Sequence, residues 1–417
     1  MKPPPLKNDC FALPPGVDWT PVDQALAHLR DVLHPVVGQN VQDLDQAIGL
    51  FLTSDVFAKR SNPPLPNSAV DGFGFKGPIP EGVQDLPLVE GRAAAGLRFN
   101  GAVPAGSAIR ILTGAALPDG VDTVVLEEDT TRDPARIMFH GPLKAGANTR
   151  RAGEDVKQGA LVLPASTLIG APELAILTAT GISEVSVFDP LKVAVLSTGD
   201  ELCGIEETAE PGQIYDANGP MLCNLFGQIG VFPRSLGQAR DNREEIRAIL
   251  NQASQTNDAI IVSGGASAGD EDHVSALLEE MGSKNLWRIA MKPGRPMAFG
   301  LWNGVPIFGL PGNPVAACVC ALVFVIPALR VLAGGGWRDP VGYMVPAGFS
   351  KNKKPGRREF LRARIGPDGR AEAFASEGSG RISGLAWANG LVEISDGAQT
   401  IKPGDMVRYI PFSSFGT

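Results

Sequence analysis

The feature that most constrains the fold is a long stretch, residues 191–334, in which short apolar segments alternate with amphipathic ones. In chain order these segments are 192–196, 220–229, 243–253, 259–262, 274–281, 305–310 and 314–332. The short apolar runs have the composition of buried strands, and the longer segments have helical spacing. This alternation predicts a doubly wound, mostly parallel sheet with helices on both faces. Such sheets bind ligands at the carboxyl ends of their strands.

The flanking segments have other patterns and predict further domains, as the length of 417 residues requires. Residues 18–52 have helical spacing, with Asp45 as the cap of a second short helix over 48–52, and a helical pattern returns at 172–180. The stretch between them is rich in Gly and Pro and has short β-like segments, which predicts a β-rich insertion. Short strands after Gly336 predict a small β-barrel or sandwich.

Composition argues against several classes of protein. A net charge of −8 disfavours a general nucleic-acid binder, which needs a dominant basic surface. The five Cys form no CxxC pair and the four His lie far apart, so neither a zinc site nor a disulfide framework is indicated. The first residues have no apolar stretch of signal-peptide length, and the apolar run at 315–329 is short for a membrane span and contains Pro327. The sequence predicts a cytoplasmic protein, with no membrane partner, in which this run is a buried helix.

Three predicted strands of the α/β stretch run into Gly-rich turns. The turns are Ser197-Thr198-Gly199-Asp200-Glu201, the run SGGASAGDED at 263–272 with Gly264, Gly265 and Ser267, and Leu310-Pro311-Gly312-Asn313-Pro314. Glycine lets backbone N–H groups approach a ligand closely, and a helix that begins just beyond adds a partial positive charge, so phosphate suits these turns. One turn is equally well explained by the ordinary geometry of such a fold. Three together, two of them with carboxylates, favour an anionic ligand with a bound cation.

Carboxylates gather on the predicted ligand edge, where they follow strands or precede helices: Asp200, Glu201, Asp241, Asp270 and Asp272. Oxygen ligands of this kind suit Mg²⁺, which typically uses one or two carboxylates together with substrate phosphate. Helix capping is an equal alternative for each residue taken singly, since Asp241 and Asp272 both directly precede predicted helices.

A basic group, Lys292-Pro293-Gly294-Arg295-Pro296, ends the strand that begins near Leu286. Two cations three residues apart, held by two prolines and a glycine, form a stiff clamp that suits an oxyanion, and a solvated turn is the alternative. Arg357, Arg358 and Arg362 add positive charge, unless they simply face water on a strand.

Together, these sequence motifs resemble those of the MoeA family, which includes the E domain of gephyrin. The matching stretches, in the family's order, are NSAVDGF at 67–73, RILTG at 110–114, GED at 153–155, STGDEL at 197–202, GQIYDAN at 212–218, SGGASAGDED at 263–272, KPGRP at 292–296, GLPGNPV at 309–315 and REFLR at 358–362. The resemblance implies four domains in an α/β multidomain fold. They are an elongated helical domain (18–61 and 151–190), a β-rich inserted domain (62–150), a doubly wound molybdopterin-binding domain (191–334) and a C-terminal β-barrel (335–417).

The resemblance also implies a function, the insertion of molybdate into molybdopterin to make the molybdenum cofactor. Adenylylated molybdopterin would bind at the Gly-rich turns, Mg²⁺ would assist cleavage of its phosphoanhydride with release of AMP, and molybdate would enter the freed dithiolene. Family members look like homodimers whose active site lies between the α/β domain of one subunit and the insert of the other. Asp71 and Thr113 would then reach the partner's cleft. Molybdopterin adenylyltransferase and molybdoenzyme maturation factors are the further partners expected.

Site residues carry over position by position. Functional positions of the family match Glu201, Asp241, Asp272, Arg288 and Lys292 in the α/β domain and Arg362 and Ser379 in the barrel. Among these and their neighbours, Lys292, Arg295 and Arg362 are expected to bind molybdate, and Asp200 and Asp272 to hold Mg²⁺. The chain departs from the common pattern at Arg288 and Arg295, where members commonly have Lys, at Phe73, where they often have Tyr, and at Ala316, where some have Ser.

Two competing functions use the same α/β domain. A molybdopterin adenylyltransferase shares the domain and its Gly-rich turns, but it has no need of the insert or the barrel. A binding scaffold that has lost catalysis is the second alternative, since fold does not fix function. The retained carboxylates and the basic clamp argue against it.

Overall fold

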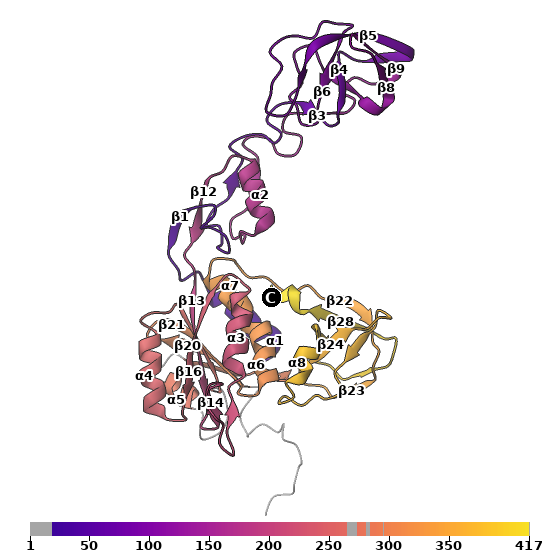
Figure 1. Cartoon of the computed structure of the whole chain (residues 1–417). Coiled ribbons are helices and arrows are strands. Elements are labelled where there is room, and N and C mark those ends of the chain that lie inside the picture. Colours follow the sequence, from indigo (N-terminus) through magenta and orange to yellow (C-terminus); the bar gives the residue numbers. More distant parts are fainter. Residues whose placement is uncertain (1–18, 265–272, 281–283, 295, 417) are drawn as a thin grey trace, which may run out of the picture. The chain divides into compact units, whose positions relative to one another are not determined.

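The computed structural model describes residues 19–264, 273–280, 284–294 and 296–416, and the chain divides into two compact units (Figure 1). Unit 1 comprises Met1–Asn40, Gly49–Thr53 and Val187–Thr417, and unit 2 comprises Val41–Ile48 and Ser54–Ser186. The chain passes between the units at strands β1 (Gln39–Asp43) and β12 (Glu184–Phe188), which pair with each other. The fold is therefore multidomain and mixed α/β.

A six-stranded sheet of order β16-β13-β17-β21-β20-β18 forms the centre of unit 1. The strands are β13 (Lys192–Thr198), β16 (Phe232–Ala239), β17 (Ala259–Ser263), β18 (Lys284–Arg288), β20 (Pro296–Trp302) and β21 (Val305–Leu310). The first four in sheet order are parallel, whereas β20 and β18 are antiparallel to their neighbours. Strands β13, β17 and β21 therefore end at one edge of the sheet.

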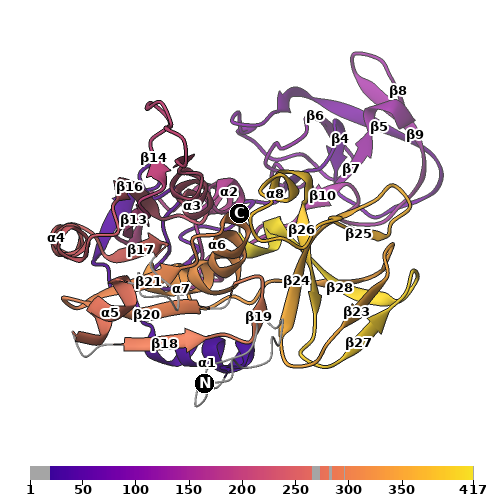
Figure 2. The same ribbon diagram turned by 90° about the horizontal axis from the view of Figure 1, so that it is seen from below.

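Helices cover both faces of this sheet (Figures 1 and 2). Helices α4 (Arg243–Ala253) and α5 (His273–Glu280) bury Ile246, Leu250 and Leu277 against one face in a common apolar core. Helix α3 (Asn218–Gly227) packs on β13 and β16 at the other face and contacts α6 (Pro314–Cys320). The short pair β14 (Leu202–Cys203) and β15 (Ile214–Tyr215) extends from the turn after β13.

The apolar segment Pro314–Leu332 lies in the core, as its sequence predicts. It comprises α6, a π-helical turn over Ala321–Val325 and α7 (Ile326–Leu332). The turn widens just before Pro327, because proline lacks an N–H and its ring would clash with a carbonyl one turn earlier. Among the described residues this is the one helix long and apolar enough to cross a membrane, and 94% of it is buried inside the protein.

The C-terminal part of unit 1 has a sheet of its own, of order β19-β24-β26-β28-β22, with β25 paired to β24 and a separate pair β23-β27. Its elements are β19 (Met291–Lys292), β22 (Tyr343–Pro346), β23 (Lys351–Lys353), β24 (Arg358–Ile365), β25 (Ala371–Ala373), α8 (Ser383–Trp387), β26 (Gly390–Ile394), β27 (Gln399–Ile401), β28 (Met406–Pro411) and a 3₁₀ turn at Phe412–Phe415. Strand β19 pairs in parallel with β24, so the segment between β18 and β20 of the α/β sheet lies beside this second sheet.

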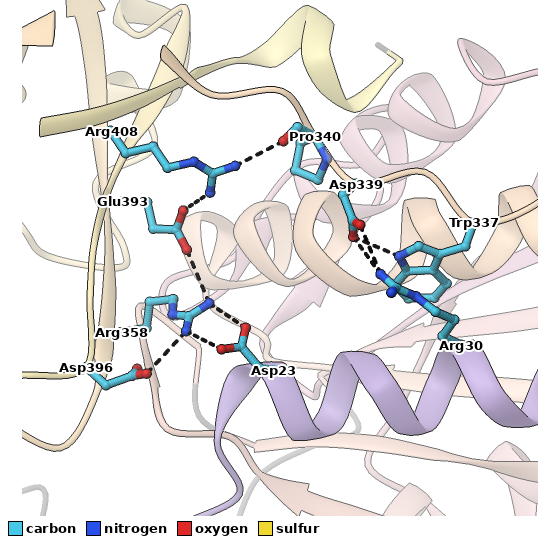
Figure 3. Close-up of polar contacts among 9 residues, drawn as sticks. All are labelled: Asp23, Arg30, Trp337, Asp339, Pro340, Arg358, Glu393, Asp396 and Arg408. Atoms are coloured by element: carbon cyan, nitrogen blue, oxygen red, sulfur yellow. Dashed lines mark hydrogen bonds and ion pairs between the residues drawn. The ribbon is translucent and has the colours of Figure 1, made fainter. Parts of the chain in front are cut away.

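Ion pairs between side chains hold helix α1 (Val22–Val32) against the second sheet (Figure 3). Arg358 lies 2.8 Å from Asp23, 3.3 Å from Glu393 and 3.2 Å from Asp396. Hydrogen bonds from Arg358 hold the pKa of Asp23 below its ordinary value. Nearby, Arg30 pairs with Asp339, and these side chains help to line a cavity of about 370 Å³.

Unit 2 has a six-stranded sheet of order β7-β4-β6-β5-β9-β8 and the pairs β10-β3 and β11-β2. Its elements are β2 (Val56–Phe57), β3 (Asn67–Ser68), β4 (Gly72–Phe75), β5 (Ile79–Ala93), β6 (Ala108–Ile111), β7 (Thr123–Leu126), a 3₁₀ turn at Glu127–Asp129, β8 (Thr130–Arg132), β9 (Arg136–Leu143), β10 (Thr149–Arg150), β11 (Leu161–Leu163) and α2 (Ala171–Ala179). The stacked rings of Phe75 and Phe139 form part of its core.

The prediction of a second helix over 48–52, capped by Asp45, is wrong. Residues 44–49 form turns, and Phe51 and Leu52 lie in isolated bridges. Gly49 has a φ of 80°, a left-handed conformation that interrupts a helix. The buried side chains at 44, 47, 50 and 51 imitate helical spacing, but the chain reaches that burial through turns.

Candidate active site

The described parts of the three predicted turns, residues 197–201, 263–264 and 310–314, meet at one edge of the α/β sheet, and Asn218 ties two of them together. This side chain, at the start of α3, donates from Nδ2 to Ser263 Oγ at 2.8 Å and to the carbonyl oxygen of Gly312 at 2.7 Å. The N–H of Gly264 donates to the carbonyl of Leu310 at 3.0 Å. The ends of β17 and β21 are therefore fixed relative to each other and to α3. Asn218 was not among the predicted site residues.

Close backbone approach explains glycine at one of these positions. Gly264 has a φ of 100°, and a Cβ there would lie 2.3 Å from the carbonyl oxygen of Thr198. At Gly199, by contrast, a Cβ would lie 2.5 Å from Glu201 Oε2, the end of a flexible side chain. The turn after β17 is thus packed against the backbone at the end of β13, which leaves no room for a side chain at Gly264.

Buried polar atoms at this edge have unused bonding capacity. Ser197 Oγ and Asn218 Oδ1 are fully buried and have no hydrogen-bond partner among the described residues. Because leaving such an atom unsatisfied costs about 1–3 kcal/mol, buried polar groups in proteins are nearly always bonded. Gly265, Ser267 and Asp272, also predicted for this site, lie outside the described residues.

Two of the predicted carboxylates face each other across neighbouring turns. The N–H of Asp241 donates to Asp200 Oδ1 at 3.1 Å, and the N–H of Asp200 lies 3.4 Å from Asp241 Oδ2. Asp200 and Glu201 are exposed and Asp241 is half-buried. Two accessible carboxylates fit the donor set of Mg²⁺, which uses few protein ligands. No group of three or more His, Cys, Asp or Glu able to hold a metal occurs within the described ranges.

Lys292 is the described member of the predicted basic clamp, because Arg295 lies outside the described residues. It stands opposite Glu359 in the β19–β24 register, and its Nζ lies 4.0 Å from Glu359 Oε2. It also forms an ion pair with Glu377. Arg288 ends β18, and its carbonyl accepts from the N–H of Thr20. Sequence reasoning gave neither glutamate a role. Glu359 lies in the REFLR motif at 358–362, whereas Glu377 lies in none of the matching motifs.

Arg362 shapes a loop of the second sheet. Its side chain is almost fully buried over the ring of Phe374 and donates to the carbonyls of Ser376, Gly378 (3.1 Å) and Arg381 (2.6 Å). Burial lowers its pKa. The guanidinium predicted to bind molybdate thus has backbone carbonyls as its partners in this structure.

The same loop reaches the third Gly-rich turn. The carbonyl of Ser379 accepts from the N–H of Val315 at 3.1 Å, at the start of α6 and directly after Gly312, Asn313 and Pro314. Gly312 and Asn313 are exposed. Unit 1 therefore brings the ends of β17 and β21, the start of α6 and the loop with Ser379 into one continuous surface.

Asp71 and Thr113 lie together in unit 2. The hydroxyl and the N–H of Thr113 both donate to Asp71 Oδ1, each at 2.6 Å. These bonds hold the pKa of the exposed Asp71 carboxyl below its ordinary value. The carboxylate is therefore ionised and held in one orientation by Thr113.

The α/β domain is of the molybdopterin-binding class: residues 194–331 match the family described as "Probable molybdopterin binding domain". Residues 20–181 match the "MoeA N-terminal region (domain I and II)", and residues 344–412 match the "MoeA C-terminal region (domain IV)". The chain therefore belongs to the MoeA family, the molybdopterin molybdenumtransferases of molybdenum cofactor biosynthesis. The family and enzyme class predicted from the motifs are confirmed.

Relatives and solved structures span nearly the whole chain. It is 34% identical to the molybdopterin molybdenumtransferase of Haemophilus influenzae, over 94% of this chain and 98% of the relative. It is 32% identical to that of a Nostoc species, over 87% and 86% of the two chains. The crystal structure of the molybdopterin biosynthesis moeA protein from Pyrococcus horikoshii OT3 has a TM-score of 0.80 and 27% identity, covering 94% of this chain and all of that one.

Proposed function

We propose that this protein inserts molybdate into adenylylated molybdopterin in a Mg²⁺-dependent reaction that releases AMP. The observation that carries the proposal is the edge of the α/β sheet, where Ser197 Oγ and Asn218 Oδ1 are buried without a partner among the described residues. They lie beside the turn at Gly264, where a Cβ would lie 2.3 Å from the carbonyl oxygen of Thr198. Matches to the N-terminal and C-terminal regions favour this reaction over the adenylyltransferase, which would need the α/β domain alone.

In this proposal each group has a defined task. N–H groups of the turns at Gly265 and Gly312 bind phosphate oxygens. Gly199 and Gly264, whose N–H groups donate to the carbonyls of Ala239 and Leu310, hold the turns in place. Ser197, Thr198, Ser267, Asn313 and Pro314 shape the rest of the binding surface. Glu201 and Asp241 act beside the phosphoanhydride. Asp200 and Asp272 hold Mg²⁺, which when bound draws charge from the phosphate oxygens.

The oxyanion lies at the basic side of the site. Lys292, Arg295 and Arg288 supply positive charge to molybdate, and the loop with Ser379, which Arg362 supports, closes the surface beside the start of α6. A dianion needs fixed donors more than flexible ones, because less side-chain freedom is then lost on binding.

The active site is shared in a homodimer, with Asp71 and Thr113 of one subunit completing the site of its partner. The pair supports this because its carboxylate is exposed, ionised and fixed by two hydrogen bonds. The domain arrangement expected from the sequence, with an elongated helical domain, an insert and a C-terminal barrel, belongs to the same proposal. So do a cytoplasmic location, an adenylyltransferase that supplies the substrate and maturation factors that accept the product.

The decisive experiment mixes purified protein with adenylylated molybdopterin, Mg²⁺ and molybdate and measures AMP by chromatography. We expect release that depends on both molybdate and Mg²⁺, and a large loss of rate in Asp272→Asn and Lys292→Ala. No molybdate-dependent AMP would reject the transferase reaction and favour a binding scaffold. Full rate in both variants would show that the site is misplaced.

A subunit-mixing experiment tests the shared site. Asp71→Asn and Lys292→Ala are each expected to be inactive, but a mixed dimer has one site with both native residues if the site is shared. Random reassociation gives heterodimers in about half of the dimers, so about one quarter of wild-type activity should return. If each site lies within one subunit, mixing restores nothing.

A further inference from the structure

Two lysines from different parts of unit 1 share one glutamate. Lys292, in β19, and Lys351, in β23, both form ion pairs with the carboxylate of Glu377, which lies in the loop between β25 and α8. In sequence Glu377 is 85 residues from Lys292 and 26 from Lys351. A carboxylate held between two ammonium groups marks a position built for an anion.

A second glutamate, Glu359, completes a cluster with Lys292, Lys351 and Glu377. Within this cluster Lys351 and Glu359 are buried, whereas Glu377 is partly exposed. Lys351 Nζ lies 2.8 Å from Glu359 Oε2, and both side chains are only 9% exposed. Glu377 is 43% exposed, so it can leave the cluster without crossing the protein interior. Burial lowers the pKa of Lys351, but hydrogen bonds to Glu359 and Glu377 outweigh it and raise that pKa. Lys351 therefore carries its charge at neutral pH.

Glu377 is also ionised at neutral pH. Burial opposes this, yet the hydrogen bonds from Lys292 and Lys351 hold its pKa below the ordinary value. Two lysines and two glutamates give the cluster no net charge. If Glu377 leaves, the remaining three groups carry a net charge of about +1, which attracts an anion more strongly when that anion has two charges.

The loop that carries Glu377 is tied to the proposed oxyanion site. Arg362 donates to the carbonyls of Ser376 and Gly378, the residues on either side of Glu377. The carbonyl of Ser379 accepts from the N–H of Val315 at the start of α6. Lys292, Arg362 and Glu377 also line one small cavity. The carboxylate thus stands at the basic side of the site, where the oxyanion is expected.

We infer that Glu377 occupies the oxyanion position in the ligand-free protein and that molybdate displaces it, with Lys351 as a further molybdate-binding residue beside Lys292. The inference rests on the proposed function, because it takes molybdate as the ligand of this site. It adds a residue from the second sheet to the oxyanion site and makes Glu377 a determinant of specificity. A monoanion that displaces Glu377 gains little binding free energy, because it brings the same charge as the carboxylate. A tetrahedral dianion brings more negative charge to the two lysines and therefore binds more strongly.

Molybdate binding to the purified full-length chain, measured by calorimetry without any pterin, tests this directly. Glu377→Gln keeps the size of the side chain and removes the competing charge, so the Kd for molybdate should fall about tenfold. Lys351→Met should raise it about tenfold, and Lys351→Arg should keep most of the affinity. Because Lys351→Met leaves Glu359 buried without its partner, the double variant Lys351→Met/Glu359→Gln is measured as well and should also bind weakly.

The matched control is Glu372→Gln on β25. Glu372 has a similar exposure and forms an ion pair with Arg364 at 2.8 Å, and it is not part of the cluster. Its affinity for molybdate should equal that of wild type.

Sulfate and nitrate serve as dianion and monoanion probes of specificity. Glu377→Gln should improve nitrate binding more than it improves sulfate binding, since removal of the competing carboxylate weakens the preference for dianions.

Three results would overturn the inference: unchanged or weaker molybdate binding in Glu377→Gln, wild-type affinity in the Lys351→Met/Glu359→Gln variant, or no molybdate binding by any variant. The AMP-release assay separates this from the wider proposal. Tighter binding in Glu377→Gln without AMP release in wild type would reject the transferase reaction and keep the oxyanion site. Normal AMP release by wild type with unchanged molybdate binding in Glu377→Gln would support the transferase reaction and reject the role of Glu377.

Discussion

Asn218→Ala is the substitution that most directly tests how the site edge is built. The side chain donates two hydrogen bonds, to Ser263 Oγ and to the carbonyl of Gly312, and is 8% exposed. The start of α3 does not depend on it, because Asp216 Oδ1 accepts from the backbone N–H groups of residues 218 and 219. The substitution therefore removes the tie between strand ends without removing the helix cap.

The magnitude follows from the groups left behind. Ser263 Oγ and the Gly312 carbonyl each lose a donor at a loss of about 1–3 kcal/mol. Alanine returns about 0.5 kcal/mol through helix propensity, and the unpartnered Asn218 Oδ1 disappears. With about 2 kcal/mol for each group, the net destabilisation of this edge is about 1.5 kcal/mol, equivalent to about tenfold faster opening.

Hydrogen exchange followed by mass spectrometry reads this edge separately from the rest of the multidomain chain, for which a single unfolding free energy is not defined. Peptides that cover β17 and β21 should exchange about tenfold faster in Asn218→Ala. Asn224→Ala is the control on the same helix, since Asn224 is exposed and accepts one bond from Gln228 at 2.9 Å. Equal exchange rates in the two variants would refute the argument that Asn218 holds the strand ends.

Thr113→Val removes the hydroxyl that donates to Asp71, so the pKa of Asp71 should rise toward its ordinary value in a carboxyl-carbon NMR titration. In wild type the ionised Asp71 contributes stability above about pH 4, which is lost as the pH falls through its lowered folded pKa, and an unchanged titration in the variant would contradict this. Arg358→Met removes the cation from Asp23 and Asp396, whereas Glu393 keeps its ion pair with Arg408. Because the Asp23 side chain is 74% exposed, solvent screens its pair, and α1 should lose about 1 kcal/mol of protection from exchange while α2 stays unchanged. Gly264→Ala places a Cβ 2.3 Å from the carbonyl oxygen of Thr198 at a φ of 100°, so β17 should lose about 2 kcal/mol of exchange protection, and wild-type rates would show that the turn can relax.

Much of the α/β domain could be predicted because its signals are local. The segments 243–253, 305–310 and 314–332 were predicted with the bounds of α4, β21 and the α6–α7 region. Strand β16 was missed, since it is an edge strand with Pro233, Gly237 and many exposed side chains, and so lacks a continuous apolar run. Strand β20 was missed as well, and it reverses direction beside β21.

The candidate site also has features that the sequence shows and features that only the folded structure shows. Its Gly-rich turns and Lys292 lie in contiguous motifs, so the sequence shows them. Asn218 and Glu359 also lie in contiguous motifs, but the motifs do not show which residues they contact. Lys351 and Glu377 lie in no such motif. The partners of Asn218 and Glu377 are distant along the chain. Arg362 was predicted as an oxyanion ligand from its charge, whereas the folded chain surrounds its guanidinium with backbone carbonyls.

By itself the sequence determines several helices and strands of the α/β domain and where its Gly-rich turns begin, because periodicity, glycine conformation and proline act over a few residues. It also determines the family, through motifs spread along the chain. It does not show the strands β16 and β20. Tertiary structure decides which charges meet. Whether Lys292 faces solvent, an oxyanion or Glu377 depends on the β19–β24 pairing and on the loop held by Arg362, since Coulomb interactions depend on distance in space and not on separation in the chain.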